Sequence, residues 1–118
     1  MINMRIEDGI LITGFPDSTR LSLEIAKKLV AQRLSAKLDK PYPIVIHLNG
    51  VISESKVVRV FMAKEGIEGI SLGAFVVKKK YEEILINMFL TIDAPKIPTR
   101  VFCNEADAIT WINTLRAI

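Results

Sequence analysis

The sequence contains few of the residues on which enzyme chemistry usually depends. Its 118 residues include one cysteine and one histidine, and aromatic residues make up only 7% of the chain. The single cysteine, Cys103, cannot form a disulfide within the chain, so the expected environment is a reducing cytoplasm. A catalytic cysteine–histidine pair would have to join Cys103 to His47, and no local motif supports such a pair.

Metal-binding residues are equally sparse, because histidine, cysteine and carboxylate side chains do not cluster at ligand spacing. The sequence also supplies no nucleophile beside a base that a third group orients. We therefore expect no metal ion, no cofactor and no enzymatic activity. His47 is expected to be an ordinary residue of a strand, on the face opposite Ile44, Ile46 and Leu48.

Long apolar segments are also missing. The longest, residues 84–92, is interrupted by Asn87 and has about half of the roughly 20 residues that a membrane-spanning helix needs. The first ten residues lack the charged, apolar and small-residue regions of a signal peptide. The sequence therefore indicates neither secretion nor membrane insertion.

The excess of basic charge is small. Sixteen lysines and arginines against 13 acidic residues give a net charge of +3, without the concentrated basic stripe that is typical of nucleic-acid binding. Only Lys78, Lys79 and Lys80 cluster. The simpler interpretation is a solvated strand end, and the alternative is contact with an anionic lipid headgroup or an acidic partner surface.

Half of the residues are hydrophobic and a quarter are charged, which is typical of one folded domain, here residues 1–118. Asp8-Gly9 lies between two short aliphatic runs and predicts a β-hairpin. Asp17, Ser18 and Thr19 are candidate N-caps for the first helix. Periodicity then predicts helices over residues 21–38, 53–64 and 81–92 and from Asn104 onward, and strands over residues 44–48, 70–77 and 99–103. The order β-β-α-β-α-β-α-β-α implies a largely parallel sheet.

The third predicted helix is apolar on nearly every side. Its inner stripe is predicted from offsets of three and four: Tyr81, Ile84, Leu85, Met88, Phe89 and Ile92. Ile86 and Leu90 lie one turn apart on another face. Burial within the protein, self-association as a homodimer and an apolar ligand cavity each explain this extra face.

The element order and two segments carry a resemblance to a known family. These segments are IVIHLNGVISESKVVRVF and INMFLTIDAPKIPTRVFCNEADAITWINTL, over residues 44–61 and 86–115. They resemble the SpoIIAA-like, or STAS-like, domains of bacteria, and in particular an uncharacterised branch. The matching positions are Asn87, Phe89, the loop over residues 95–99, Phe102, Glu105, Ala108 and Trp111. The resemblance covers essentially the whole chain and implies a mixed, largely parallel five-stranded sheet with an N-terminal hairpin and four helices.

The characterised STAS domains imply a regulatory role. In those anti-sigma-factor antagonists, a serine at the start of the second helix is phosphorylated, and the phosphate disrupts the contact with the partner. Ser53 and Ser55 occupy the corresponding place here, but the neighbouring aspartate and glycine of the motif are missing. Helix capping is the simpler interpretation of both serines, although the same helix terminus would also stabilise a phosphate.

The function expected from this resemblance is a non-enzymatic regulatory or protein-interaction module with an unidentified protein partner, which can also form a homodimer. The expected partner surface comprises Asn49, Glu54, Lys56, Ile86 and Leu90. The alternative is a small apolar-ligand or lipid-binding domain that uses the third helix and the lysine cluster. The two alternatives share the third helix.

Overall fold

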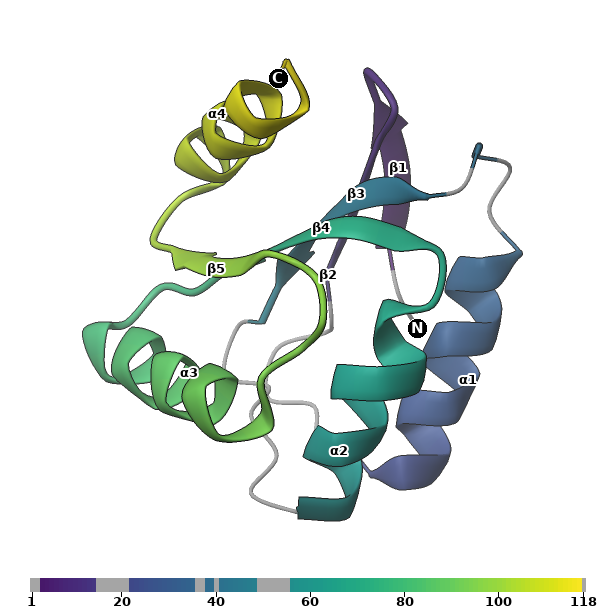
Figure 1. The fold of residues 1–118 in the computed structure, drawn as a ribbon, viewed down its shortest axis with the longest axis vertical. Helices are drawn as coiled ribbons and strands as arrows, with labels where there is room; N and C mark the ends of the chain where they lie inside the picture. Colours follow the sequence, from purple (N-terminus) through teal and green to yellow (C-terminus); the bar gives the residue numbers. More distant parts are fainter. Residues whose placement is uncertain (1–2, 15–21, 36–37, 40, 49–55, 118) are drawn as a thin grey trace.

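The computed structural model describes residues 3–14, 22–35, 38–39, 41–48 and 56–117 (Figure 1). This part of the chain forms five strands, four α-helices and one short 3-10 turn. Their bounds are β1 Asn3–Glu7, β2 Ile10–Gly14, α1 Leu23–Leu34, β3 Tyr42–His47, α2 Lys56–Lys64, η1 Glu65–Ile67, β4 Ile70–Val76, α3 Lys80–Asp93, β5 Thr99–Phe102 and α4 Glu105–Arg116. The predicted order of strands and helices is confirmed.

The five strands form one mixed sheet in the order β1-β2-β3-β4-β5. β1 and β2 are antiparallel, and the other neighbours are parallel. The β1–β2 turn is the predicted hairpin, since Asp8 and Gly9 both have positive φ angles, of 50° and 77°. A two-residue type I′ turn requires positive φ at both positions, which is why Asp-Gly forms it readily.

The helices cover the two faces of the sheet unequally. Figure 1 shows α4 on one side of the sheet and α1, α2 and α3 on the other. Alternate residues of a strand point to opposite faces, so each central strand contributes to both layers. On β3, for example, Val45 packs toward α4, whereas Ile44 and Ile46 point toward the other three helices.

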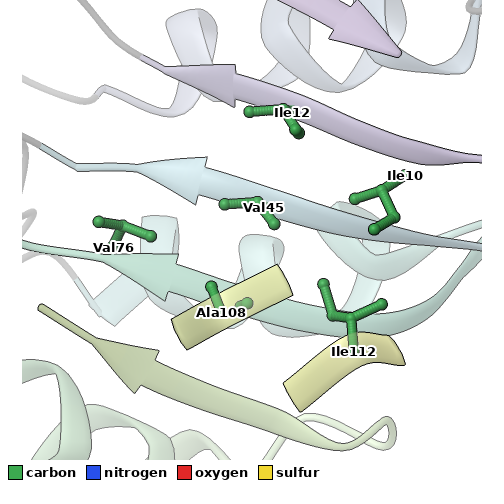
Figure 2. Close-up of a cluster of buried hydrophobic side chains, with 7 residues drawn as sticks. Ile10, Ile12, Val45, Val76, Ala108 and Ile112 are labelled. Atoms are coloured by element: carbon green, nitrogen blue, oxygen red, sulfur yellow. The ribbon is translucent and has the colours of Figure 1, made fainter. Parts of the chain in front are cut away.

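The α4 face has a continuous core, which Figure 2 shows as side chains from three strands meeting those of α4. Ala108 and Ile112 of α4 are both completely buried. Asn104 caps α4, because its side-chain oxygen accepts a hydrogen bond from the Asp107 N–H at 2.8 Å. The core consists of Ile10, Ile12, Val45, Ala74, Val76, Ala108 and Ile112.

On the opposite face, a buried arginine joins α1 to the connection between α2 and β4. Nη1 of Arg33 donates to the Tyr42 hydroxyl at 3.1 Å and to the Glu68 carbonyl at 2.8 Å. Its Nη2 donates to the Gly66 carbonyl at 3.0 Å. A buried guanidinium is tolerated only when such partners replace water. Arg33 therefore links α1 to β3 and to the α2–β4 connection through hydrogen bonds.

The first helix is shorter than predicted. The pattern that continues to Leu38 suggested helix over residues 21–38, but α1 ends at Leu34. The Ser35 hydroxyl donates to the Gln32 carbonyl at 2.6 Å, a local bond that competes with helix continuation. Leu38 instead packs against the cluster around Leu11. The observed N-cap is Ser22, and the candidates at residues 17–19 lie outside the described part.

The predicted orientation of the third helix is wrong. Four residues of its expected inner stripe are exposed: Tyr81 by 60%, Ile84 by 62%, Met88 by 48% and Ile92 by 62%. Ile86, on a different face from this stripe, is buried, which is one of the three explanations left open for that face, and Leu90 packs against the same cluster. Because α3 is apolar on nearly every side, periodicity does not determine which side packs inward. On α2, Val57 is likewise an exposed apolar residue.

Candidate functional site

The predicted phosphorylation site falls outside the described part of the structure. Ser53 and Ser55 lie there together with Asn49 and Glu54 of the expected partner surface. Lys56 is described, and it is the exposed first residue of α2. A phosphorylation switch at the start of the second helix therefore stays a prediction.

An apolar cavity lies between the sheet and helices α2 and α3. Its volume is about 150 Å³. Ile86 and Leu90, the residues that made α3 unusual in sequence, both lie in its wall. Other apolar residues of the lining are Ile44, Ile46, Leu48, Val58, Met62, Ala63, Ile67, Ile70, Ala74, Phe75, Phe89, Pro95 and Ile97.

A glycine on β4 leaves room in this cavity. A Cβ atom at Gly73 would lie 3.6 Å from the Thr99 side chain and 3.8 Å from the Ile97 Cδ1 atom, which are ordinary contact distances. An added methyl group would therefore occupy cavity space without displacing the backbone. Apolar cavities of this kind stay dry and can bind a small apolar molecule.

A charged pair joins the two helices that border the cavity. Nε of Arg59, on α2, donates to Oδ2 of Asp93, at the end of α3, over 3.0 Å. The two side chains are only 18% and 11% exposed. The guanidinium of Arg59 also lies over the Phe89 ring, 4.5 Å from its centre. The pair therefore contributes two charged side chains to a largely apolar lining.

The lysine cluster lies at the beginning of α3, and all three lysines are exposed. Nζ of Lys80 is 3.1 Å from Glu83 Oε1, and the ammonium of Lys79 lies 5.8 Å from the centre of the Tyr81 ring. The buried carboxylate of Glu82 accepts a hydrogen bond from the Lys79 N–H. Glu82 and Glu83 thus supply the negative charge that a helix N-terminus favours.

The structure gives Cys103 and His47 different hydrogen-bond partners. The Cys103 thiol donates to Glu83 Oε2 over 3.0 Å, and this bond raises the pKa of the thiol above its usual range. A nucleophilic cysteine requires the opposite change, because the thiolate is the reactive form. Each of the two residues is instead paired with a carboxylate, Cys103 with Glu83 and His47 with Glu105.

His47 belongs to a polar cluster that the sequence analysis missed. Its Nε2 lies 2.7 Å from Glu105 Oε1, and Arg5 donates to Glu105 Oε2 over 2.7 Å. Partial burial raises the pKa of Glu105, but the bonds from His47 and Arg5 outweigh it, and the net pKa is lowered. No local signal could have revealed this cluster, since Glu105 is 58 and 100 residues away from its partners.

The described residues lack two further features. They contain no group of three or more histidine, cysteine or acidic side chains that could hold a metal ion. No helix among them is long and apolar enough to cross a membrane.

The described elements have the SpoIIAA-like α/β fold. A similar crystal structure is that of an uncharacterised protein of the DUF3478 family with a SpoIIAA-like fold, from Shewanella loihica PV-4. The TM-score is 0.62 at 13% sequence identity, over 94% of this chain and 91% of that one. The predicted fold class is thereby confirmed, while identity this low carries no information on function.

The family itself follows from the match over residues 4–116 to the model described as "Domain of unknown function (DUF7793)". This match covers nearly the whole chain, so the protein belongs to that family. No curated protein matches the chain. The function is therefore inferred from the geometry of the molecule.

Proposed function

We propose that this protein is a non-enzymatic binding domain whose cavity accepts one small apolar group, such as an aromatic ring or a short acyl chain. The observation that carries this proposal is the apolar lining of the cavity under α2 and α3. Such a lining offers a ligand little beyond removal from water, which contributes about 25 cal/mol per Å² of apolar surface. The proposal develops the ligand-binding alternative of the sequence analysis.

The size of the cavity limits the class of ligand. Its volume of about 150 Å³ matches that of an engineered protein cavity of about 150 Å³ that binds benzene. Pockets for drug-sized molecules have volumes of about 300–1,000 Å³. A single ring or a short chain is therefore the appropriate size, and a complete two-chain lipid is too large.

The described polar groups support the non-enzymatic part of the proposal. Arg59 and Asp93 neutralise each other beside the cavity, and the raised pKa of Cys103 keeps its thiol protonated. Neither arrangement provides an activated nucleophile. His47 does have a carboxylate partner, Glu105, but its strand position directs it to the α4 face, away from the cavity.

The regulatory alternative concerns a different part of the molecule. Phosphorylation of Ser53 or Ser55 and recognition by a protein partner stay predictions, because both serines lie outside the described residues. Mass spectrometry of the protein isolated from its native cell, with complete coverage of this peptide, tests them directly. A peptide that is never phosphorylated would remove the switch without affecting the cavity proposal.

Ligand titration by two-dimensional NMR tests the cavity proposal, with indole as the aromatic probe and hexanoate as the short acyl probe. We expect saturable shifts at Val58, Ile86 and Gly73, which border the cavity. Gly73→Ala should weaken binding of both probes at least severalfold, because the added methyl group occupies ligand space.

A matched pair of leucines provides the control. Leu90 lines the cavity, whereas Leu115 belongs to α4, and both are partly buried. Leu90→Ala should change the affinity for the probes, and Leu115→Ala should leave it unchanged. Absence of saturable shifts at millimolar concentrations of both probes would contradict the proposal, as would equal effects of the two leucine variants.

A further inference from the structure

The exposed side of α3 carries a continuous apolar stripe. Tyr81, Ile84, Met88 and Ile92 follow one another at helix offsets of three, four and four, which places them on one face. All four are about half exposed or more. The opposite side of the same helix packs on the sheet through Ile86, so α3 has two apolar sides and only one of them is covered.

The charge at this surface is positive. Lys78, Lys79 and Lys80 are exposed at the beginning of α3. The carboxylates of the helix are engaged within the protein: Glu82 is buried, and Glu83 is held by Lys80 and Cys103. Asp93 is held by Arg59. The apolar stripe therefore begins beside a cationic cluster whose positive charge exceeds the negative charge exposed around it.

Tyr81 connects the cluster with the stripe. Its ring is 60% exposed, and Lys79 lies over that ring. Tyrosine combines an apolar ring with a polar hydroxyl, and it is enriched where apolar and aqueous regions meet. The surface is thus cationic at the lysines, amphipathic at Tyr81 and apolar along the rest of α3.

We propose that this face of α3, defined by Lys78, Lys79, Tyr81, Ile84, Met88 and Ile92, docks on the surface of an anionic lipid bilayer. The helix lies in the plane of the membrane, the apolar side chains enter the boundary between headgroups and acyl chains, and the lysines contact anionic headgroups. This inference concerns the outer side of α3 and does not rest on a ligand in the cavity.

A second copy of the chain fits the same surface less well. Four large side chains that are about half exposed offer roughly 400 Å². One partner in an ordinary dimer buries about 800 Å². An anionic bilayer also supplies negative charge beside Lys78 and Lys79.

Vesicle co-sedimentation of the full chain tests the proposal. We expect binding to vesicles of equimolar phosphatidylcholine and phosphatidylglycerol, weaker binding at high salt, and no binding to phosphatidylcholine alone. Lys78→Ala should lower the partition coefficient about fivefold, because each lysine near an anionic surface contributes about 1 kcal/mol. Ile84→Ser should lower it about tenfold.

Two variants on other surfaces act as matched controls. Lys27→Ala removes an exposed lysine from α1, and Ile6→Ser removes a half-exposed isoleucine from the edge strand β1. Both should bind anionic vesicles like the unmodified protein. Unfolding curves should show that Ile84→Ser remains folded, since Ile84 is mostly exposed.

Three results would overturn the proposal. One is a lack of binding to anionic vesicles at low salt. Another is equal loss of binding in Ile84→Ser and Ile6→Ser, which would mean that the face of α3 is not specific. The third is a dimer in vesicle-free sedimentation that Ile84→Ser converts to a monomer, because the stripe would then be an interface between two copies.

Discussion

The two faces of the sheet are built from the same aliphatic residue types but packed differently. On the α4 side, Ala108 and Ile112 are fully buried against the strands. On the other side, α2 and α3 enclose a cavity, and the outer surface of α3 is apolar. The α4 side is thus a packed core, whereas α3 has apolar surface beyond what its contact with the sheet covers.

The polar contacts differ in the same way. The first residue of α4, Glu105, is tied to the sheet through His47 and Arg5. Asp93, the last residue of α3, forms its ion pair with Arg59 of the neighbouring helix α2 and not with a strand.

Shortening an isoleucine on each face should give the largest difference in stability. Ile112→Ala should lower the free energy of unfolding by about 2–5 kcal/mol, because it removes contacts in a packed core. Ile86→Ala should cost less, about 1–3 kcal/mol, because Ile86 already borders empty space. Urea unfolding followed by circular dichroism measures both values. Equal losses would contradict the packing difference between the two faces.

A buried hydroxyl should produce a smaller effect of opposite sign. Thr13 points to the cavity side of the sheet, because Ile10 and Ile12 point to the α4 side. Its Oγ1 is buried without a hydrogen-bond partner. Thr13→Val should therefore raise the free energy of unfolding by about 1 kcal/mol, since valine has a similar shape and no unsatisfied hydroxyl.

Thr99 provides the control for this substitution. Its hydroxyl donates to the Ile97 carbonyl over 3.1 Å, so Thr99→Val should lower stability by about 1 kcal/mol. The same denaturant titration compares the two variants. A destabilised Thr13→Val protein would show that the buried hydroxyl is stabilising.

Acid should affect the attachment of α4 slightly more than that of α3. The pKa of Glu105 is lowered in the folded protein. Its stabilising contribution is therefore complete above the ordinary value of 4.5 and is lost as the pH falls through the lowered folded pKa. Glu105→Gln should reduce the slope of stability against pH in this acidic range.

The comparison for this experiment is Glu83→Gln, at the beginning of α3. The pKa of Glu83 is also lowered, first by the Cys103 thiol and then by Lys80. Because one partner of Glu83 is an uncharged thiol and the other, Lys80, is 76% exposed, substitution of Glu83 should change the slope less. A larger change from Glu83→Gln would contradict the stronger attachment of α4.

Local chemistry accounts for the features that were predicted correctly. The Asp8-Gly9 hairpin depends on two positive φ angles, and the start of α4 depends on one side-chain cap from Asn104. The strand-helix alternation that follows the hairpin determines a mostly parallel sheet. Each of these signals depends on residues that are close together in the chain, so each feature can be predicted from the sequence alone.

The candidate sites depend on contacts between distant residues. Ile86 and Leu90 marked α3 as unusual, but their direction could not be predicted, because α3 is apolar on nearly every side and its periodicity fits several rotations about the helix axis. The Arg5–Glu105–His47 cluster likewise has no local pattern.

The sequence by itself thus determined the element order, the hairpin, the cap of α4 and the apolar character of α3. Tertiary structure decided which side of α3 contacts the sheet, and hence where the cavity and the exposed stripe lie. The physical reason is that burial free energy depends on the apolar area removed from water. A helix with apolar residues on all sides gains similar burial in several orientations, so its neighbours determine the one it adopts.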